Sequence, residues 1–97
     1  MFRHCVLMRF AAEATAAQKT AALEGIRSLP DLIPEVRELA VGPDAGLREG
    51  NFDLAVVADF DDEAAYAIYA AHPAHVDMLS EVVAPILSER AAVQYRI

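Results

Sequence analysis

Polar rings are concentrated in one short stretch of the chain, which holds Tyr66, Tyr69, His72 and His75. A neutral imidazole accepts a proton, and the unperturbed histidine pKa of about 6.5 leaves His75 neutral at cellular pH. The phenol of Tyr69 could donate a hydrogen bond to an oxygen on which negative charge develops. The two groups together indicate removal of a proton from a carbon next to a carbonyl, a reaction that requires neither a metal nor a cofactor.

Pro73 decides how these rings are arranged. Proline lacks a helical N–H donor and restricts the residue before it, so one helix should end near His72 and another should begin at Pro73. Tyr69 and His75 would then flank a bend and converge on one spot. The alternative is structural: the two histidines cap helix ends, while Tyr66 and Tyr69 pack against strands.

A third polar ring, His4, belongs to a segment that alternates with period two, which is typical of a strand. One face of this strand carries Phe2, His4, Val6, Met8 and Phe10. If that face meets the helices, His4 lies in the same layer as Tyr69 and His75 and would orient the substrate. Alternatively, His4 is a histidine at a strand end that bonds to water or to a backbone carbonyl.

Two other kinds of site have weaker support. His72 and His75 have the i, i+3 spacing of some metal-binding helices, but Pro73 disrupts that geometry and no carboxylate recurs at ligand spacing, so we expect no metal site. Cys5 is expected to be a small packed hydrophobe, and the adjacent His4 points to the opposite strand face. No nucleophile-elbow glycines accompany the candidate serines Ser28, Ser80 and Ser88.

The composition bounds the architecture. The 97 residues suffice for one domain, 1–97, and 56% of them are hydrophobic. A chain of this size buries only about 60–68% of its unfolded surface, and several predicted strands are apolar on both faces. A large exposed apolar face is an interaction site or an aggregation hazard, so we expect a homodimer.

The charge bounds the partners. With 15 acidic against 8 basic residues, the net charge of −7 repels phosphate backbones and anionic lipids, and we expect neither nucleic acid nor membrane as a partner. No apolar stretch approaches the roughly 18–20 residues of a membrane span, and the N-terminus does not resemble a signal peptide. The chain is therefore predicted to be cytoplasmic, and its single cysteine cannot form an internal disulfide.

The first half of the chain shows a strand, a helix and a second strand. The motif Thr15-Ala-Ala-Gln18 matches a capping box at a helix start. This helix buries Ala22, Leu23, Ile26 and Leu29, and Pro30 is expected to close it. The predicted strands are 2–10 and 36–41, the second an edge strand because it carries charges.

The second half shows a strand, a broken helix and a final strand. Residues 43–51 form a polar loop that could act as a flap. Residues 52–60 are the most apolar segment and read as a central strand covered on both sides. The remaining elements are predicted as helices over 61–71 and 73–87, with Pro85 shortening the second, and a strand over 91–97.

The order β-α-β-β-α-β predicts an α+β, ferredoxin-like fold, with one four-stranded antiparallel sheet and helices on one face. The other sheet face is left bare. Pairing of two such faces would give a dimeric α+β barrel of eight strands with the helices outside.

The chain resembles the stress-responsive A/B barrel family, the dimeric α+β barrel domain known as Dabb. The resemblance covers nearly the whole chain and rests on the segments 2–7, 15–18, 32–34, 49–53 and 69–75, of which the last, Tyr-Ala-Ala-His-Pro-Ala-His, is the most specific. It implies a homodimer with a small-molecule cavity in each subunit, between the sheet and the helices.

Within that family the nearest chemical parallel is the plant polyketide cyclase type that closes an aromatic ring to form olivetolic acid. Tyr69 and His75 resemble its working pair, and His4 resembles its N-terminal pocket histidine. The chain departs from that type in helix one, where Ala22, Leu23 and Ile26 replace an aromatic residue, and at Asp53, which replaces a histidine. The resemblance implies that the ligand contacts are Val6, Met8, Ile26, Asp53, Ala55, His72 and Met78.

Two functions follow, and the sequence leaves both open. The first is a cofactor-independent cyclase or lyase acting on a small aromatic or polyketide-like molecule, with His75 as base, Tyr69 as hydrogen-bond donor and His4 orienting the substrate. The second is a non-catalytic stress-responsive or ligand-binding protein. An open cavity of a few hundred cubic ångströms beside Tyr69 and His75 would favour the first, and a filled one the second. A third interpretation, a ferredoxin-like monooxygenase, shares the barrel but has no separate motif.

Overall fold

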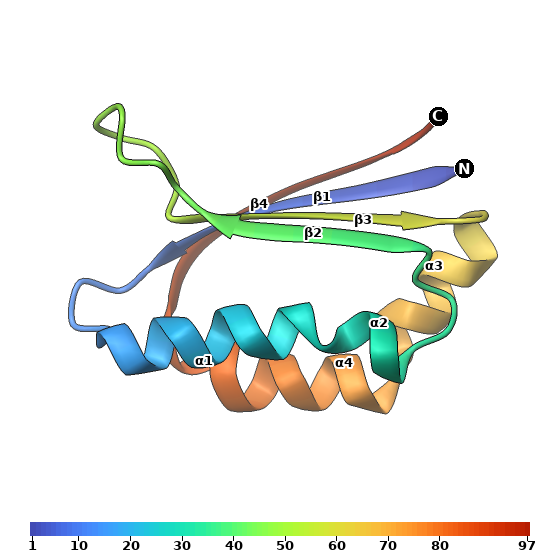
Figure 1. Ribbon diagram of the computed structural model, residues 1–97, viewed down its shortest axis with the longest axis horizontal. Coiled ribbons are helices and arrows are strands. Elements are labelled where there is room, and N and C mark those ends of the chain that lie inside the picture. The colour runs from blue at the N-terminus through green and yellow to red at the C-terminus, as the bar shows by residue number, and fades with distance from the viewer.

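The computed structural model covers residues 1–97 and contains one antiparallel sheet with helices on a single face (Figure 1). The strand order is β2-β3-β1-β4, as a ferredoxin-like βαββαβ chain requires. The strands are β1 (Phe2–Phe10), β2 (Glu38–Pro43), β3 (Leu54–Phe60) and β4 (Leu87–Arg96). The predicted α+β ferredoxin-like fold is confirmed, with β2 at one sheet edge as expected and β4 at the other.

The helical layer consists of two groups of short helices that cover one side of the sheet (Figure 1). The first group is α1 (Ala16–Arg27) and α2 (Leu29–Leu32), and the second is α3 (Glu63–Ala71), α4 (Pro73–Met78), the π-helical turn η1 (Leu79–Val83) and the 3₁₀ turn η2 (Ala84–Ile86). None of them is long and apolar enough to cross a membrane.

Local sequence signals account for several of the helix ends. The predicted capping box is present, since the Thr15 hydroxyl accepts from the Gln18 backbone N–H at 3.1 Å and the Gln18 side chain accepts from the Thr15 N–H at 2.9 Å. The sequence led us to expect that Pro30 closes the first helix, and this prediction is wrong. The helix ends at Arg27, and Pro30 lies in the first turn of α2, where its missing N–H has no cost.

Strand boundaries shift from the predicted ones where prolines and turns intervene. β4 begins at Leu87, four residues before the predicted start at Ala91, because the helix is already ended by the 3₁₀ turn that contains Pro85. β2 begins at Glu38 and β3 at Leu54, each two residues later than predicted.

The core lies between the sheet and the helices. Alternate residues of β1 are buried, and these are the predicted set Phe2, His4, Val6, Met8 and Phe10. One cluster around Val6 and Met8 packs against Ala22 and Ile26 of α1, and a second around Phe60 packs against Leu29 and Tyr69. The second cluster includes Tyr69 itself, and Tyr66 packs against it.

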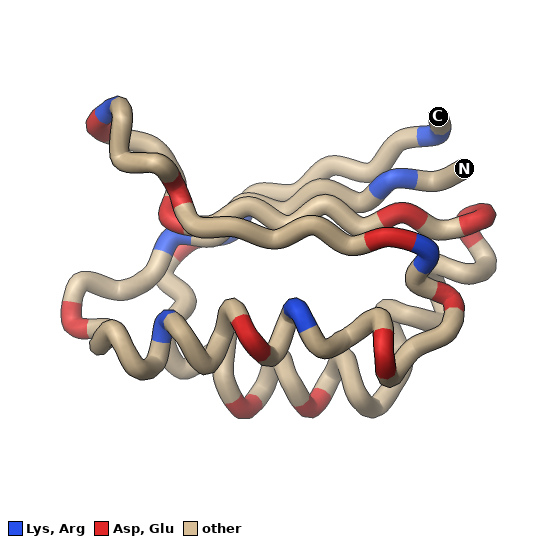
Figure 2. The backbone as a smooth tube through the Cα atoms, viewed as in Figure 1, with Lys and Arg blue, Asp and Glu red and all other residues tan.

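The opposite face of the sheet is bare in the protomer. Figure 2 shows that the middle of the sheet carries no charged residue, whereas acidic residues lie along the helical layer. The strand register places small or apolar side chains there: Ala40, Gly42, Ala55, Val57, Cys5, Leu7, Ala91 and Val93. We call this set the open face. The prediction that β3 is covered on both sides is therefore wrong for the protomer.

Candidate functional site

Three elements bring the predicted rings together. β1 supplies His4 on its buried face, α3 supplies Tyr69 and α4 supplies His75. The chain turns between α3 and α4 because His72 adopts an extended conformation before Pro73, as predicted. The Nδ1 atom of His72 accepts from the Ala74 backbone N–H at 3.0 Å and caps α4. His72 therefore caps a helix end, as the structural alternative predicted.

The rings lie in direct contact. The centroids of Tyr69 and His75 are 4.3 Å apart, and those of His4 and Tyr69 are 6.3 Å apart. The ring centroids of Tyr66 and His4 are 5.0 Å apart, and those of Phe60 and Tyr69 are also 5.0 Å apart. Tyr69 and His75 therefore flank the bend and converge, as the position of Pro73 predicted.

His75 is held in the form that a general base needs. Its Nδ1 atom lies 3.1 Å from the backbone carbonyl of Ala70, so this nitrogen carries the proton and donates it to the carbonyl. In the neutral ring the Nε2 atom is then an acceptor. Burial is the largest cause and lowers the pKa of His75, the hydrogen bond to the Ala70 carbonyl opposes this shift, and the positive charge of Arg90 lowers the pKa further. The net shift is downward, so the ring is neutral near pH 7.

His4 is more deeply buried, with 5% of its surface exposed. Burial is the first cause that lowers the pKa of His4 to about 4, and Arg90 and His75 lower it further. Its Nδ1 atom lies 2.8 Å from the Nε2 atom of Gln94 on β4. His4 is therefore neutral and hydrogen-bonded, whereas the alternative considered from the sequence had it bonded to water or to backbone.

Tyr69 remains protonated under ordinary conditions. It is 4% exposed, and burial raises the pKa of its phenol to about 12, with Tyr66 adding to the effect and Arg90 opposing it. A phenol with a raised pKa donates a hydrogen bond and does not act as a base at neutral pH. Tyr69 thus has the character of an oxyanion donor.

The polar ends of the three rings are free. The Tyr69 hydroxyl and the Nε2 atoms of His4 and His75 have no hydrogen-bond partner within the chain, since each histidine bonds only through Nδ1. No fully buried side-chain nitrogen or oxygen lacks a partner, so these three atoms reach solvent. The cluster therefore leaves one acceptor and two further polar groups without a partner in the protein.

The predicted ligand contacts separate into two groups. Val6, Met8 and Ile26 lie in the core cluster on the helical side of the sheet, and Met78 packs against it. Ala55 was wrongly predicted for this side, because it pairs with Leu7 and its side chain lies on the open face. Asp53 also lies elsewhere, since it directly precedes β3 and its carboxylate accepts from the Phe10 backbone N–H at 2.7 Å.

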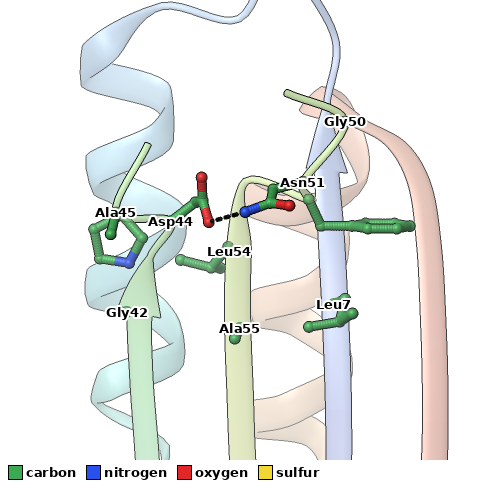
Figure 3. Close-up of a pocket in the computed structure, with 10 residues that line it drawn as sticks. Leu7, Gly42, Asp44, Ala45, Gly50, Asn51, Leu54 and Ala55 are labelled. Carbon is green, nitrogen blue, oxygen red and sulfur yellow. Dashed lines mark hydrogen bonds between the residues drawn. The ribbon is translucent and has the colours of Figure 1, made fainter. Parts of the chain in front are cut away.

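Figure 3 shows where Ala55 lies, in a hollow of about 480 Å³ on the open face beneath the loop 44–51. The hollow is also lined by Leu7 and Gly42, and the Asn51 side-chain amide donates to Asp44 at 3.1 Å across the loop. None of the five cavities that we describe is lined by His4, Tyr69 or His75. None of these five is therefore the open cavity beside Tyr69 and His75 that the first function would favour.

Two residues of the site were missed by sequence reasoning, and both lie on β4. Gln94 contacts His4, and Arg90 influences the pKa of all three rings. The register pairs His4 with Gln94 and Met8 with Arg90, which places both side chains on the helical side. Period-two alternation indicates that residues 90, 92 and 94 share a face, but not which partners they meet. No group of three or more His, Cys, Asp or Glu side chains is placed to hold a metal ion.

Comparisons with known proteins agree with this architecture. A dimeric ferredoxin-like protein of unknown function from Thermobifida fusca is 40% identical, with 99% of this chain and 90% of that chain covered and a TM-score of 0.90. A dimeric protein of ferredoxin-like fold from Bacteroides fragilis is 27% identical, covering 99% and 95%, with a TM-score of 0.84. A hydroxynitrile lyase from Passiflora edulis is 22% identical, covering 99% and 92%, with a TM-score of 0.88, and this likeness shows the fold alone.

The family is identified by a match that covers nearly the whole chain. A search of curated proteins found no match. The family model of the stress responsive A/B barrel domain matches residues 2–97. The match includes the strand that carries His4, the helices that carry Tyr69 and His75, and the strand that carries Gln94. The chain belongs to the stress responsive A/B barrel domain (Dabb) family.

Proposed function

We propose that this protein is a homodimer in which each subunit binds a small carbonyl compound at the His4, Tyr69 and His75 rings and catalyses a cofactor-independent proton transfer of the cyclase or lyase type. His75 is the general base and Tyr69 the donor to the developing oxyanion. His4 orients the substrate. A small aromatic or polyketide-like molecule is the substrate class that the sequence resemblance favours.

The observation that carries the proposal is the complementary state of two touching rings. His75 donates through Nδ1 to Ala70 and keeps an unpaired acceptor at Nε2. Tyr69, with its centroid 4.3 Å away, keeps its proton because burial raises the pKa of the phenol. A base and a hydrogen-bond donor side by side, both reaching solvent, are what removal of a proton next to a carbonyl requires.

The step balances without a further reactant. The Nε2 atom of His75 forms a bond to the proton as the carbon–hydrogen bond breaks, and the electron pair moves through the carbon–carbon bond to the carbonyl oxygen. The Tyr69 hydroxyl stabilises that oxyanion. The enolate then attacks a second carbonyl, whose oxygen takes the proton from the His75 imidazolium, or it expels a leaving group, which takes that proton instead. That a structural relative is named a hydroxynitrile lyase supports keeping lyase chemistry beside ring closure.

Deuterium exchange tests the catalytic role without knowledge of the natural substrate. Small aromatic ketones and β-keto esters are incubated with the protein in heavy water, and loss of the hydrogens next to the carbonyl is followed by proton NMR. We expect the wild-type protein to accelerate exchange of at least one compound, Tyr69→Phe to slow it by roughly 10–10³-fold, and His75→Asn to abolish the acceleration. Asparagine keeps a donor for the Ala70 carbonyl.

The matched control is His72→Asn, which replaces a neighbouring histidine and preserves the cap of α4, because asparagine is a favoured N-cap residue. It should exchange as fast as the wild-type protein. Equal acceleration by the wild-type protein and His75→Asn would contradict the proposed mechanism.

The dimer is proposed to form through the open face. Its small and apolar side chains would otherwise remain in water, and the relatives from Thermobifida fusca and Bacteroides fragilis are described as dimeric. Leu7 lies near the middle of this face and is 42% exposed in the protomer. Leu7→Asp should reduce the mass measured by light scattering from twice 10.5 kDa to 10.5 kDa. Ile68→Asp, at a 52% exposed position on α3, should remain dimeric.

A second candidate function is ligand binding without catalysis. The observation that favours it is that no cavity we describe is lined by the three rings, which pack against one another. A compound that binds at these rings but whose exchange is not accelerated would support this function over the cyclase or lyase.

A further inference from the structure

Gln94 is the one side chain that bonds to His4, and it comes from the far end of the chain. β1 and β4 are antiparallel, and their register sets Gln94 directly opposite His4 on the helical side of the sheet. The Gln94 Nε2 atom lies 2.8 Å from the His4 Nδ1 atom. Gln94 itself is exposed, on the strand that forms the sheet edge. The contact is therefore a long-range one that core packing does not explain.

A neutral imidazole has one donor nitrogen and one acceptor nitrogen, and the partner of one nitrogen decides the role of the other. The Gln94 amide nitrogen can only donate. His4 must then accept at Nδ1 and carry its proton on Nε2. His75 has the opposite arrangement, since its Nδ1–H donates to Ala70 and its Nε2 accepts.

We propose that Gln94 is a positioning residue that fixes His4 as the Nε2–H tautomer, so that His4 presents a hydrogen-bond donor to the substrate while His75 presents an acceptor. This inference rests on the proposed function and narrows its substrate class. With donors at Tyr69 and His4 and one acceptor at His75, the site suits a molecule with two carbonyl oxygens around an acidic carbon, a 1,3-dicarbonyl.

The surroundings of His4 are compatible with this role. The groups that face His4 are Arg90 on the helical side of β4, Tyr66 and Tyr69 from α3, and His75 from α4. No carboxylate is bonded to it, so a positively charged His4 would have no counter-ion. The neutral ring depends on Gln94 alone for the choice between its two tautomers.

The test reads the tautomer directly and needs no substrate. In protein with ¹⁵N-labelled histidine, long-range ¹H–¹⁵N correlation spectra at about pH 7.5 distinguish a protonated ring nitrogen from an unprotonated one. In the wild-type protein we expect the His4 proton on Nε2. Gln94→Glu supplies a carboxylate that can only accept, so the proton should move to Nδ1 and the midpoint of the His4 titration should rise. Gln94→Leu should give a mixture of both tautomers.

Arg96→Gln is the control, because Arg96 lies on the same face of the same strand and pairs with Glu63, away from His4. Its spectrum should match that of the wild-type protein, and unchanged His72 signals would show that each variant is folded. A wild-type His4 protonated on Nδ1, or a tautomer that stays the same in Gln94→Glu and Gln94→Leu, would overturn the inference. Neither result depends on turnover, whereas loss of the proposed function would appear only in the exchange experiment.

Discussion

Replacing His4 by phenylalanine should make the protein less sensitive to acid. In the folded protein burial lowers the pKa of His4 to about 4, whereas an unfolded chain has the ordinary value of about 6.5. Between these two values the unfolded state binds a proton that the folded state does not. The stability that comes from neutral His4 is therefore fully present above about pH 6.5 and is lost as the pH falls toward about 4.

The size of the effect follows from the shift. One pKa unit corresponds to about 1.36 kcal/mol, so the contribution of His4 to the free energy of unfolding should fall by about 2 kcal/mol between about pH 7 and about pH 5. It should fall by about 3 kcal/mol once the pH is near 4. Burial also lowers the pKa of His75, which acts in the same direction, so only a comparison of variants isolates His4.

The assay is urea unfolding followed by far-ultraviolet circular dichroism at about pH 7 and about pH 5. Both proteins are measured at one concentration, because the stability of a dimer depends on it. The wild-type protein should lose about 2 kcal/mol more than His4→Phe over this interval, since all other titrating groups are shared. Equal losses in the two proteins, or a larger loss in His4→Phe, would refute the assignment of His4 as a neutral buried ring.

The remaining predictions concern charge, capping and packing. Arg90→Gln should raise the pKa of His4 in a histidine NMR titration, because the positive charge of Arg90 helps to lower it. The control Arg48→Gln, in the exposed loop, should leave the pKa of His4 unchanged. A lower or unchanged pKa of His4 in Arg90→Gln would contradict the effect of this charge. Thr15→Ala should cost about 1 kcal/mol in urea unfolding by removing the cap of α1, and a neutral result would mean that the capping box does not stabilise the helix in solution. Phe60→Ala should cost about 3–5 kcal/mol, since Phe60 is fully buried beneath Tyr69, and a cost below about 1 kcal/mol would contradict that packing.

Local signals predicted the positions of the rings. The period-two alternation of β1 placed His4 on the buried face, and Pro73 marked the bend at which Tyr69 and His75 meet. Both inferences depend on residues adjacent in sequence, where backbone geometry alone decides the outcome. The dimer, the substrate and the cytoplasmic location remain predictions.

The sequence was not sufficient to predict which face of the sheet a β3 side chain lies on, or which side chain on a neighbouring strand His4 contacts. Ala55 was assigned to the wrong side because residues 54–58 are all apolar, so no alternation marks which side is buried. The bond between His4 and Gln94 depends on the register of two strands at opposite ends of the chain, and no local pattern determines that register.

The most direct test of the proposed function is a crystal structure of the dimer soaked with a 1,3-dicarbonyl compound or a small aromatic ketone. The proposed function predicts that the compound separates the rings, with an oxygen within hydrogen-bond distance of the Tyr69 hydroxyl and the carbon next to the carbonyl beside the His75 Nε2 atom. A compound bound only in the hollow beneath the loop 44–51, with Tyr69 and His75 still in contact, would contradict it.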